Sequence, residues 1–114
     1  MAANLTVDRE GQVNDWNAEA AELLGYSAAQ AIGRVMDFFI PAEYHADHWA
    51  GFRHAIASGT LKFTSSDVLP VEMIYLNGTR FPIDVTIDPQ RDGAGNITTL
   101  SAELKAAGPR GPKM

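Results

Sequence analysis

The apolar positions follow a period of two near both ends of the chain and a helical period in the middle. Close to the start, two short apolar stretches, residues 5–7 and 13–16, flank the sequence DREGQ. Asp and Gly readily adopt the backbone conformations of tight turns, so this segment predicts a β-hairpin. The chain is therefore expected to open with two antiparallel strands.

Helical spacing begins after this hairpin and is interrupted by capping residues. Asn17 precedes AEAAELLGY, in which apolar residues recur at helical spacing until Gly25 ends the helix. Ser27 precedes a second short stretch, AAQAIG, which Gly33 closes. Asn and Ser side chains accept hydrogen bonds from free N–H groups at helix starts, and Gly tolerates the left-handed backbone at helix ends. Two short helices are expected here.

A third short piece, VMDFFIP, leads into the longest predicted helix. Pro is favoured in the first turn of a helix, so Pro41 is expected to open a helix that extends to Gly59. All the histidines of the chain lie in this helix: His45, His48 and His54. A helical wheel places His48 between Tyr44 and Phe52, among apolar residues, and points His54 away from them.

The period returns to two after Gly59. Residues 61–69 and 71–76 predict strand pieces on either side of Pro70, and Asn77-Gly78 is a strong signal for a tight turn. The stretch RFPIDVTI follows with its apolar residues on one face: Phe81, Ile83, Val85 and Ile87. DPQRDGAGN then predicts a loop and ITTLSAEL a last strand. The order is two strands, several helices and three strands.

Composition and charge narrow the class of protein. The 114 residues, 46% apolar, have the size of one domain, which we assign to residues 1–105 with a flexible tail at 106–114. A net charge of −5 with scattered Lys and Arg argues against a nucleic-acid partner. No run long enough to span a membrane and no signal peptide is visible, so a cytoplasmic protein without a membrane partner is expected. Zero cysteines exclude thiolate chemistry.

Three motifs resemble the PAS domain family. They are VDREGQVNDWNAEAAELLGYSAAQAIGR near the start, NGTRFPIDVTI at the predicted tight turn, and RDGAGNI before the last strand. The resemblance covers nearly all of the chain. It implies an α+β fold, with a five-stranded antiparallel sheet in the spatial order 2-1-5-4-3 and helices on one face. The flavin photosensors of this family use a reactive cysteine, which this chain lacks.

The resemblance also bears on the histidine-bearing helix. IPAEYHADH is similar to a stretch of oxygen-sensing histidine kinases whose PAS domain holds haem, and their haem-ligating histidine stands seven residues after the proline. The matching residue here is His48. The resemblance thus implies haem b with His48 as the iron ligand, and His45 ranks well behind it. The alternative is that His48 is a core residue with ordinary hydrogen-bond partners.

Haem needs an apolar slot with cations at one end. Tyr44 and Phe52 flank His48 on the helix. The strands are expected to supply the remaining apolar side chains: Leu69, Met73, Ile83, Val85, Ile87 and Leu100. Three basic residues near the end of the helix are either partners for the haem carboxylates or solvated surface charges: Arg53, His54 and Lys62.

Two strand residues bear on which gas such a haem would bind. The haem-binding relatives carry, on the strand after the helix, an arginine that hydrogen-bonds bound oxygen, and the matching position is Leu69 or a neighbour. Without this charge-assisted hydrogen bond, carbon monoxide or nitric oxide is expected to bind comparatively well. Met73 is either a sixth iron ligand or an ordinary core side chain.

The sequence predicts a binding domain and no enzyme. Asp84, Thr86 and Asp88 alternate with apolar residues, as the solvent side of a strand requires, and no catalytic motif accompanies them. Two functions are therefore carried forward. The first is a haem-based sensor of O2, CO, NO or redox state that signals through an effector protein or as a homodimer. The second is a cofactor-free PAS module that binds a small metabolite or dimerises.

Overall fold

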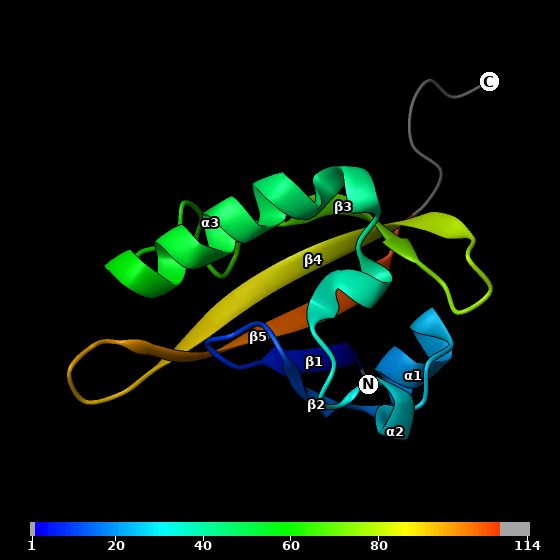
Figure 1. The fold of residues 1–114 in the computed structure, drawn as a ribbon, viewed down its shortest axis with the longest axis horizontal. Coiled ribbons are helices and arrows are strands. Elements are labelled where there is room, and N and C mark those ends of the chain that lie inside the picture. The colour runs from blue at the N-terminus through cyan, green and yellow to red at the C-terminus, as the bar shows by residue number, and fades with distance from the viewer. Residues whose placement is uncertain (1, 108–114) are drawn as a thin grey trace.

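An antiparallel sheet of five strands forms the base of the protein (Figure 1). The computed structural model describes residues 2–107. The spatial order of the strands is β2-β1-β5-β4-β3, which confirms the predicted order 2-1-5-4-3. The strands are β1 (Ala3–Val7), β2 (Val13–Trp16), β3 (Leu69–Ile74), β4 (Arg80–Arg91) and β5 (Ile97–Ala106).

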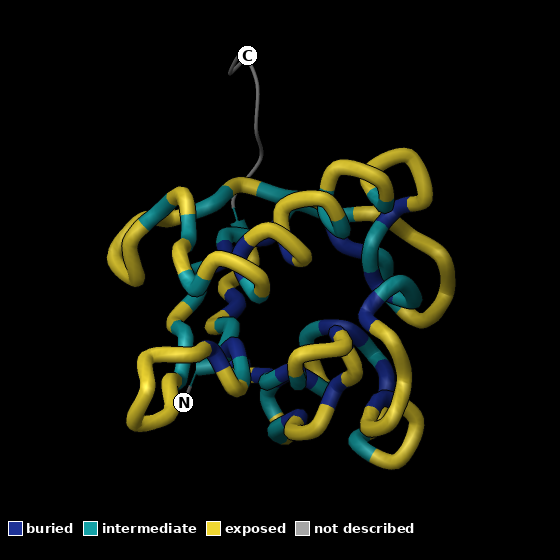
Figure 2. The backbone as a smooth tube through the Cα atoms, turned by 60° about the vertical axis from the view of Figure 1, so that its left-hand side comes forward, coloured by how far each residue is buried: buried dark blue, intermediate teal, exposed yellow. Residues whose placement is uncertain are grey.

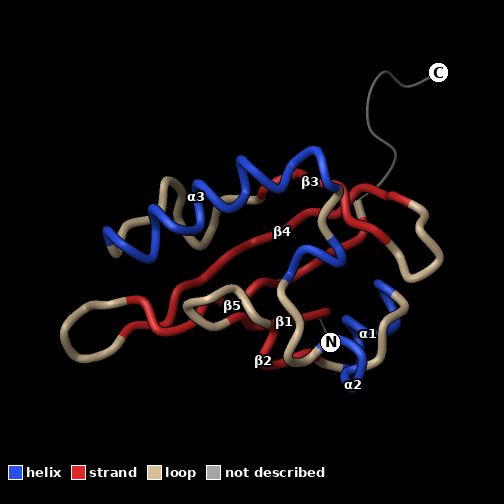
Figure 3. Tube along the Cα trace, viewed as in Figure 1, coloured by secondary structure: helices blue, strands red, loops and turns tan. Residues whose placement is uncertain are grey.

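The helical segments lie between β2 and β3 in the chain and cover one face of the sheet (Figure 3). They are α1 (Ala18–Leu24), α2 (Ala28–Ala31), the 3-10 helices η1 (Met36–Phe39) and η2 (Ala42–Tyr44), and α3 (His45–Ser58). The element order of two strands, several helices and three strands is as predicted.

The predicted caps of α1 and α2 are confirmed. The Asn17 side chain accepts a hydrogen bond of 2.8 Å from the backbone N–H of Ala20, and Gly25 ends α1 with a φ of 86°. Ser27 and Gln30 form a reciprocal capping box, in which each side chain accepts from the other's backbone N–H. These local contacts are why such short helices begin and end where the sequence predicts.

The long predicted helix is confirmed in extent but not in its first turn. Residues 42–44 form a 3-10 turn, and the α-helix proper starts at His45. Gly59 closes it with a φ of 74°, and its N–H donates to the carbonyl of Ala55 at 2.8 Å. Short 3-10 turns are frequent at the N-terminal ends of α-helices.

The predicted strand over residues 61–69 is wrong except at its last residue. The backbone N–H of Thr64 donates to a carboxylate oxygen of Asp67 at 2.8 Å, and the Asp67 N–H donates back to the Thr64 carbonyl. Such local side-chain hydrogen bonds compete with a strand ladder, so the segment forms a loop. The strand starts at Leu69 and contains Pro70, which is tolerated because β3 is an edge strand.

The loop predicted over residues 88–96 is shorter than expected because β4 continues to Arg91. The turn that follows is held by Asp92, whose carboxylate accepts hydrogen bonds of 2.9 Å from the backbone N–H groups of Ala94 and Asn96. An aspartate that bonds the backbone ahead of it in this way is typical of tight turns.

The end of the described chain remains attached to the sheet. Strand β5 includes Ala106, and the N–H of Ala107 donates to the Pro82 carbonyl at 3.1 Å. The rest of the tail predicted at 106–114 lies outside the described residues. Among residues 2–107, no helix is long and apolar enough to cross a membrane.

The two faces of the sheet differ in polarity, and strand register explains the difference. Val85 on β4 lies opposite Leu104 on β5, while the next pair along the ladder is Thr86 with Glu103. Val85 and Leu104 are buried, and Glu103 is exposed. The inner face is thus apolar and the outer face polar, as the predicted alternation of β4 requires.

An aromatic part of the core lies where α1, α2 and η1 meet β1 and β2. The Trp16 ring lies within 6.5 Å, centroid to centroid, of the rings of Tyr26, Phe38 and Phe39. Its indole N–H donates to the Tyr26 carbonyl at 2.9 Å. Aromatic rings in contact at these distances bury much apolar area, and the indole proton is satisfied at the same time.

Candidate functional site

A cavity of about 370 Å³ lies between α3 and the inner face of the sheet. Strands β1, β3, β4 and β5 line it from one side, and η1, α3 and residues 60–63 from the other. Its lining is largely apolar, and its volume is at the lower end of the range of about 300–1,000 Å³ that is typical of small-molecule sites. Helix α3 is exposed over much of its length, and its only buried residues are Phe52 and Ala55 (Figure 2).

The structure brings together nearly all of the residues that the sequence predicts for a cofactor site. Those that line the cavity are His48, Tyr44, Phe52, His54, Lys62, Leu69, Met73, Val85 and Ile87. Leu100, also expected in the slot, lines the cavity as well, whereas Arg53 and Ile83 do not. The Arg53 guanidinium instead lies over the Trp49 ring, 5.7 Å from the centroid. That these residues contact a cofactor stays a prediction.

His48 is the polar group that distinguishes this cavity. Its Nδ1 is buried and has no hydrogen-bond partner among the described residues. Its ring lies 5.1 Å from the Trp49 ring and 6.1 Å from the Phe52 ring, centroid to centroid. Burial lowers the pKa of His48 from its ordinary value, and His45 lowers it further against the opposing effect of Asp37. The imidazole is therefore neutral at pH 7, with an unused buried nitrogen.

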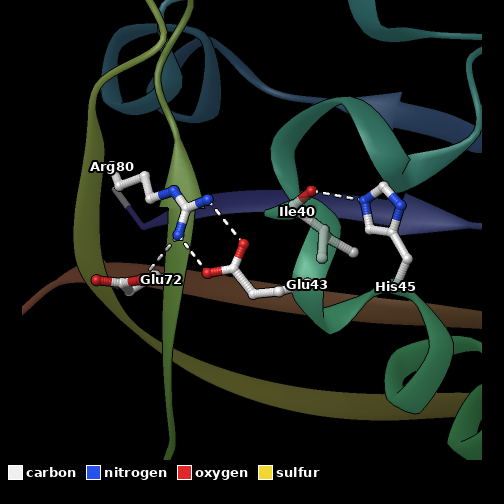
Figure 4. Close-up of polar contacts among 5 residues, drawn as sticks. All are labelled: Ile40, Glu43, His45, Glu72 and Arg80. Atoms are coloured by element: carbon white, nitrogen blue, oxygen red, sulfur yellow. Dashed lines mark hydrogen bonds and ion pairs between the residues drawn. The ribbon is translucent and has the colours of Figure 1, made fainter.

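The other two histidines of α3 differ from His48. The Nε2 of His45 donates to the Ile40 carbonyl at 2.7 Å, so this ring ties the start of α3 to the end of η1 (Figure 4). The minor alternative of His45 as an iron ligand loses support, because that nitrogen is already bonded and His45 does not line the cavity. His54 lines the cavity but is an exposed residue.

An ion-pair cluster beside the cavity ties η2, the short helix that precedes α3, to the sheet (Figure 4). Arg80 on β4 makes two hydrogen bonds of 2.5 and 2.7 Å to the Glu43 carboxylate on η2, and lies 3.9 Å from Glu72 on β3. The hydrogen bonds from Arg80 hold the pKa of Glu43 below its ordinary value. Glu72 and the neighbouring Tyr44 both line the cavity, so the cluster stands at its rim.

A second arginine of β4 holds the opposite end of α3. Arg91 donates to the Gly59 carbonyl at 2.7 Å and to the Gly95 carbonyl at 3.1 Å. Helix α3 is thus tied to strand β4 near both of its ends, by Arg80 through η2 and by Arg91 through Gly59. The cavity lies under the stretch between these two ties.

Several lining residues were missed by sequence reasoning. Strand β1 and helix η1 supply Leu5, Val7, Met36 and Phe39. The alternation of β1 identifies the inner face of Leu5 and Val7, but no local signal shows that β1 lies next to the site. Conversely Ile83, expected in the slot, is fully buried in the core and does not line the cavity.

Residues 2–107 contain no group of three or more His, Cys, Asp or Glu side chains placed to hold a metal ion. A bare ion at His48 would therefore lack ligands from the described part of the chain, since metal sites built by protein alone use three or more. An imidazole on its own is sufficient only where the metal brings its other ligands with it, as iron does in haem.

Comparison with known proteins identifies the family. Residues 2–105 match the family described as the PAS fold. The chain belongs to the PAS family. This PAS domain is 29% identical over 96 residues, 83% of its length, to an uncharacterized protein of Azorhizobium caulinodans, and it spans 13% of that protein.

Solved structures agree on the fold. The PAS domain of a protein from Colwellia psychrerythraea superimposes with a TM-score of 0.78 at 18% identity, over 93% of this chain and 86% of that one. An RNA-binding light-oxygen-voltage receptor has a TM-score of 0.73 at 23% identity, over 92% of this chain and 29% of the receptor. A light-oxygen-voltage domain from a flavin-analogue study has a TM-score of 0.75 at 16% identity, with coverage of 95% and 78%. At these identities the likeness establishes the fold alone.

Proposed function

We propose that this PAS domain is a sensor module that binds haem b beneath α3, with His48 as the iron ligand. The proposal is carried by two observations on His48: the residue lines an apolar cavity, and its buried Nδ1 has no hydrogen-bond partner among the described residues. Leaving a buried polar atom unpaired costs about 1–3 kcal/mol. An unpaired atom that a native protein keeps in spite of this cost therefore calls for a functional explanation. A bond to a ligand relieves this cost.

The residues present fit a haem group in three respects. The cavity lining opposite α3 is apolar, with Met73, Val85 and Ile87 on the strands. Lys62 and His54, both exposed and both lining the cavity, are the basic side chains available to the two carboxylates. The depressed pKa of His48 keeps the imidazole unprotonated, which metal binding requires. Bound haem would supply an iron centre for a diatomic gas or for a redox change.

The strand residues determine which gas this site favours. Leu69, at or next to the position where the haem-binding proteins that this chain resembles carry arginine, lines the cavity, and β3 contains no Lys or Arg. Without Lys or Arg, this strand would offer bound oxygen no charge-assisted hydrogen bond from a cation. We therefore propose carbon monoxide or nitric oxide as the gas ligand, with Met73 available as an internal competitor for the sixth position.

A second candidate is a cofactor-free site for a small apolar metabolite that hydrogen-bonds to His48. The volume of about 370 Å³, near the lower limit for small-molecule sites, favours this candidate.

Flavin is a poorer candidate than either haem or a small apolar metabolite. The flavin ring has a polar edge that needs hydrogen-bond partners, and the residues lining the cavity include no Asn or Gln. Cysteine-based flavin photochemistry is excluded because the chain has no cysteine.

The proposed role is signalling without catalysis, through an effector protein. The outer face of the sheet carries Thr86, Asp88, Ser101 and Glu103 around a shallow polar hollow. Lys105 shares this face with Asp88 and Glu103, so two copies meeting through it could pair opposite charges. A homodimer therefore stays the second route by which the signal leaves the domain.

The test is a haem titration of the full chain followed by absorption spectroscopy. Wild-type protein is expected to bind one equivalent, with a narrow Soret band that shifts when carbon monoxide is added to the reduced sample. His48→Ala should lose or strongly alter the band, whereas Arg53→Ala, which changes an exposed residue of the same helix that does not line the cavity, should retain it. If wild type gives only the broad band of free haem, the haem assignment is wrong, and thermal-shift screening of small apolar compounds tests the second candidate.

A further inference from the structure

Helix α3 contains a glycine at an unfavourable position. Gly51 lies in the middle of the helix, three residues after His48, and lines the cavity. Glycine is among the least favourable residues in a helix interior, because it loses more backbone freedom on folding than any other residue. A glycine at this position is therefore expected to have a specific reason.

The described part of the chain does not supply that reason. Gly51 has no positive φ, so its backbone does not require glycine. A Cβ built on it would meet no heavy atom within 4 Å, so packing does not require glycine either. Gly11 is different, because a Cβ there would lie 2.2 Å from an atom of the Trp49 ring. Gly25 also lacks room, with the Tyr75 ring 2.7 Å away.

The position of Gly51 relative to His48 indicates what the open space is for. The residues of the helix and its first turn that line the cavity fall on one side of the helix: Tyr44, Asp47, His48, Gly51, Phe52, His54 and Ala55. Side chains of a helix lean toward its N-terminus, so a side chain at position 51 would cover the turn that carries His48. Glycine at this exposed position has no side chain and leaves that turn uncovered.

We propose that Gly51 is a specificity-determining residue of the cavity. It lets a flat ring system lie against the backbone of α3 while an atom of the same ligand reaches His48. The ligand class is thus a planar, conjugated, largely apolar molecule, since a ring face needs a clear surface beside its anchoring group. This inference rests on the proposed function in one respect, that the ligand occupies the cavity next to His48.

The experiment compares Gly51→Ala, Gly51→Leu and Ala50→Leu in the full chain. Ala50 is the matched control, because it is exposed on the same helix and does not line the cavity. Both Gly51 variants should unfold at a higher urea concentration than wild type, since each replaces glycine by a better helix former. In haem titrations Gly51→Leu should bind at least about tenfold more weakly than wild type, as overpacking predicts, while Ala50→Leu binds like wild type.

Gly51→Leu is expected to raise the stability of the protein and to weaken haem binding, and these opposite effects make the result unambiguous. Weaker binding by a variant that is more stable cannot come from misfolding. If Gly51→Leu binds haem as tightly as wild type, the inference is overturned and the haem assignment stands. If wild type does not take up haem, the haem assignment fails, and the fluorescent probe 1-anilinonaphthalene-8-sulfonate, which carries a flat naphthalene ring, replaces it. Selective loss of probe binding in Gly51→Leu then supports the inference, whereas equal binding, or no binding by wild type, overturns it.

Discussion

The helical layer meets the sheet in two different ways. At one end, α1 and α2 pack directly against β1 and β2, and the rings around Trp16 fill the space between them. At the other end, α3 lies over the sheet (Figure 1). A cavity lies beneath it, and Arg80 and Arg91 tie it to β4 near its two ends. In the first region the indole N–H of Trp16 has a partner, whereas in the second a buried nitrogen of His48 has none.

This difference separates the part that stabilises the fold from the part that can respond to a ligand. Close packing of aromatic side chains stabilises the native state strongly and tolerates little change. A helix that buries only two of its residues and is tied near its ends by exposed polar contacts opens at lower free energy, and binding sites are commonly drawn from such regions. Substitutions in the two regions should therefore have different consequences.

The largest effect is expected from Trp16→Ala in the packed region. The change removes a 3%-exposed side chain and leaves the Tyr26 carbonyl without its donor, so the free energy of unfolding should fall by about 3–5 kcal/mol. Urea denaturation followed by circular dichroism measures it. Trp49→Ala on half-buried α3 is the comparison, and a loss there as large as that of Trp16→Ala would contradict the distinction between the regions.

A smaller effect of the opposite sign is expected from His48→Phe. Phenylalanine keeps an aromatic ring at this position but has no nitrogen to leave unpaired. At pH 8 the variant should therefore be as stable as wild type or more stable by about 1 kcal/mol. Haem binding through His48 should be lost at the same time. A large loss of stability would mean that the imidazole has a structural partner after all.

The same variant should change how stability depends on pH. The pKa of His48 is lowered in the folded state from its ordinary value of 6.5, so the unfolded chain takes up the proton first as the pH falls. Wild-type stability should therefore decline below about pH 6.5, and this part of the decline should be absent in His48→Phe. The lowered pKa values of Glu43 and Asp92 act in a separate window, at and below their ordinary values of 4.5 and 3.8. Identical pH profiles for the two proteins would contradict the prediction.

The smallest effect on stability is expected from Arg80→Gln, which breaks the exposed ion pair with Glu43 at the cavity rim. Exposed ion pairs contribute little to stability, so the urea midpoint should barely change. Ligand exchange should become faster, because one of the two ties of α3 is lost. Stopped-flow mixing with haem measures the rate, and Arg34→Gln, which removes the cation over the Phe38 ring outside the cavity, is the control. An unchanged rate in Arg80→Gln would show that the tie does not control access.

How far the sequence predicted this structure depends on the range of the interactions concerned. The caps at Asn17 and Ser27 were predictable because each side chain bonds a backbone group three residues away. The strand predicted over residues 61–69 is wrong up to residue 68, because a local turn between Thr64 and Asp67 outweighed a weak alternation of apolar residues. Register could not be derived from that segment, yet Leu69 and Met73 were still placed correctly on the cavity lining.

The amino-acid sequence alone establishes the order of elements, their caps, the apolar face of each strand and the placement of His48 among apolar residues, because these follow from interactions between near neighbours. The cavity itself, the Glu43–Arg80 pair and the contact of Arg91 with Gly59 arise only when segments more than thirty residues apart are brought together. The absence of a partner for the His48 Nδ1 is likewise decided only by the tertiary structure. It depends on everything that folding packs around that atom, and no local pattern in the chain records it.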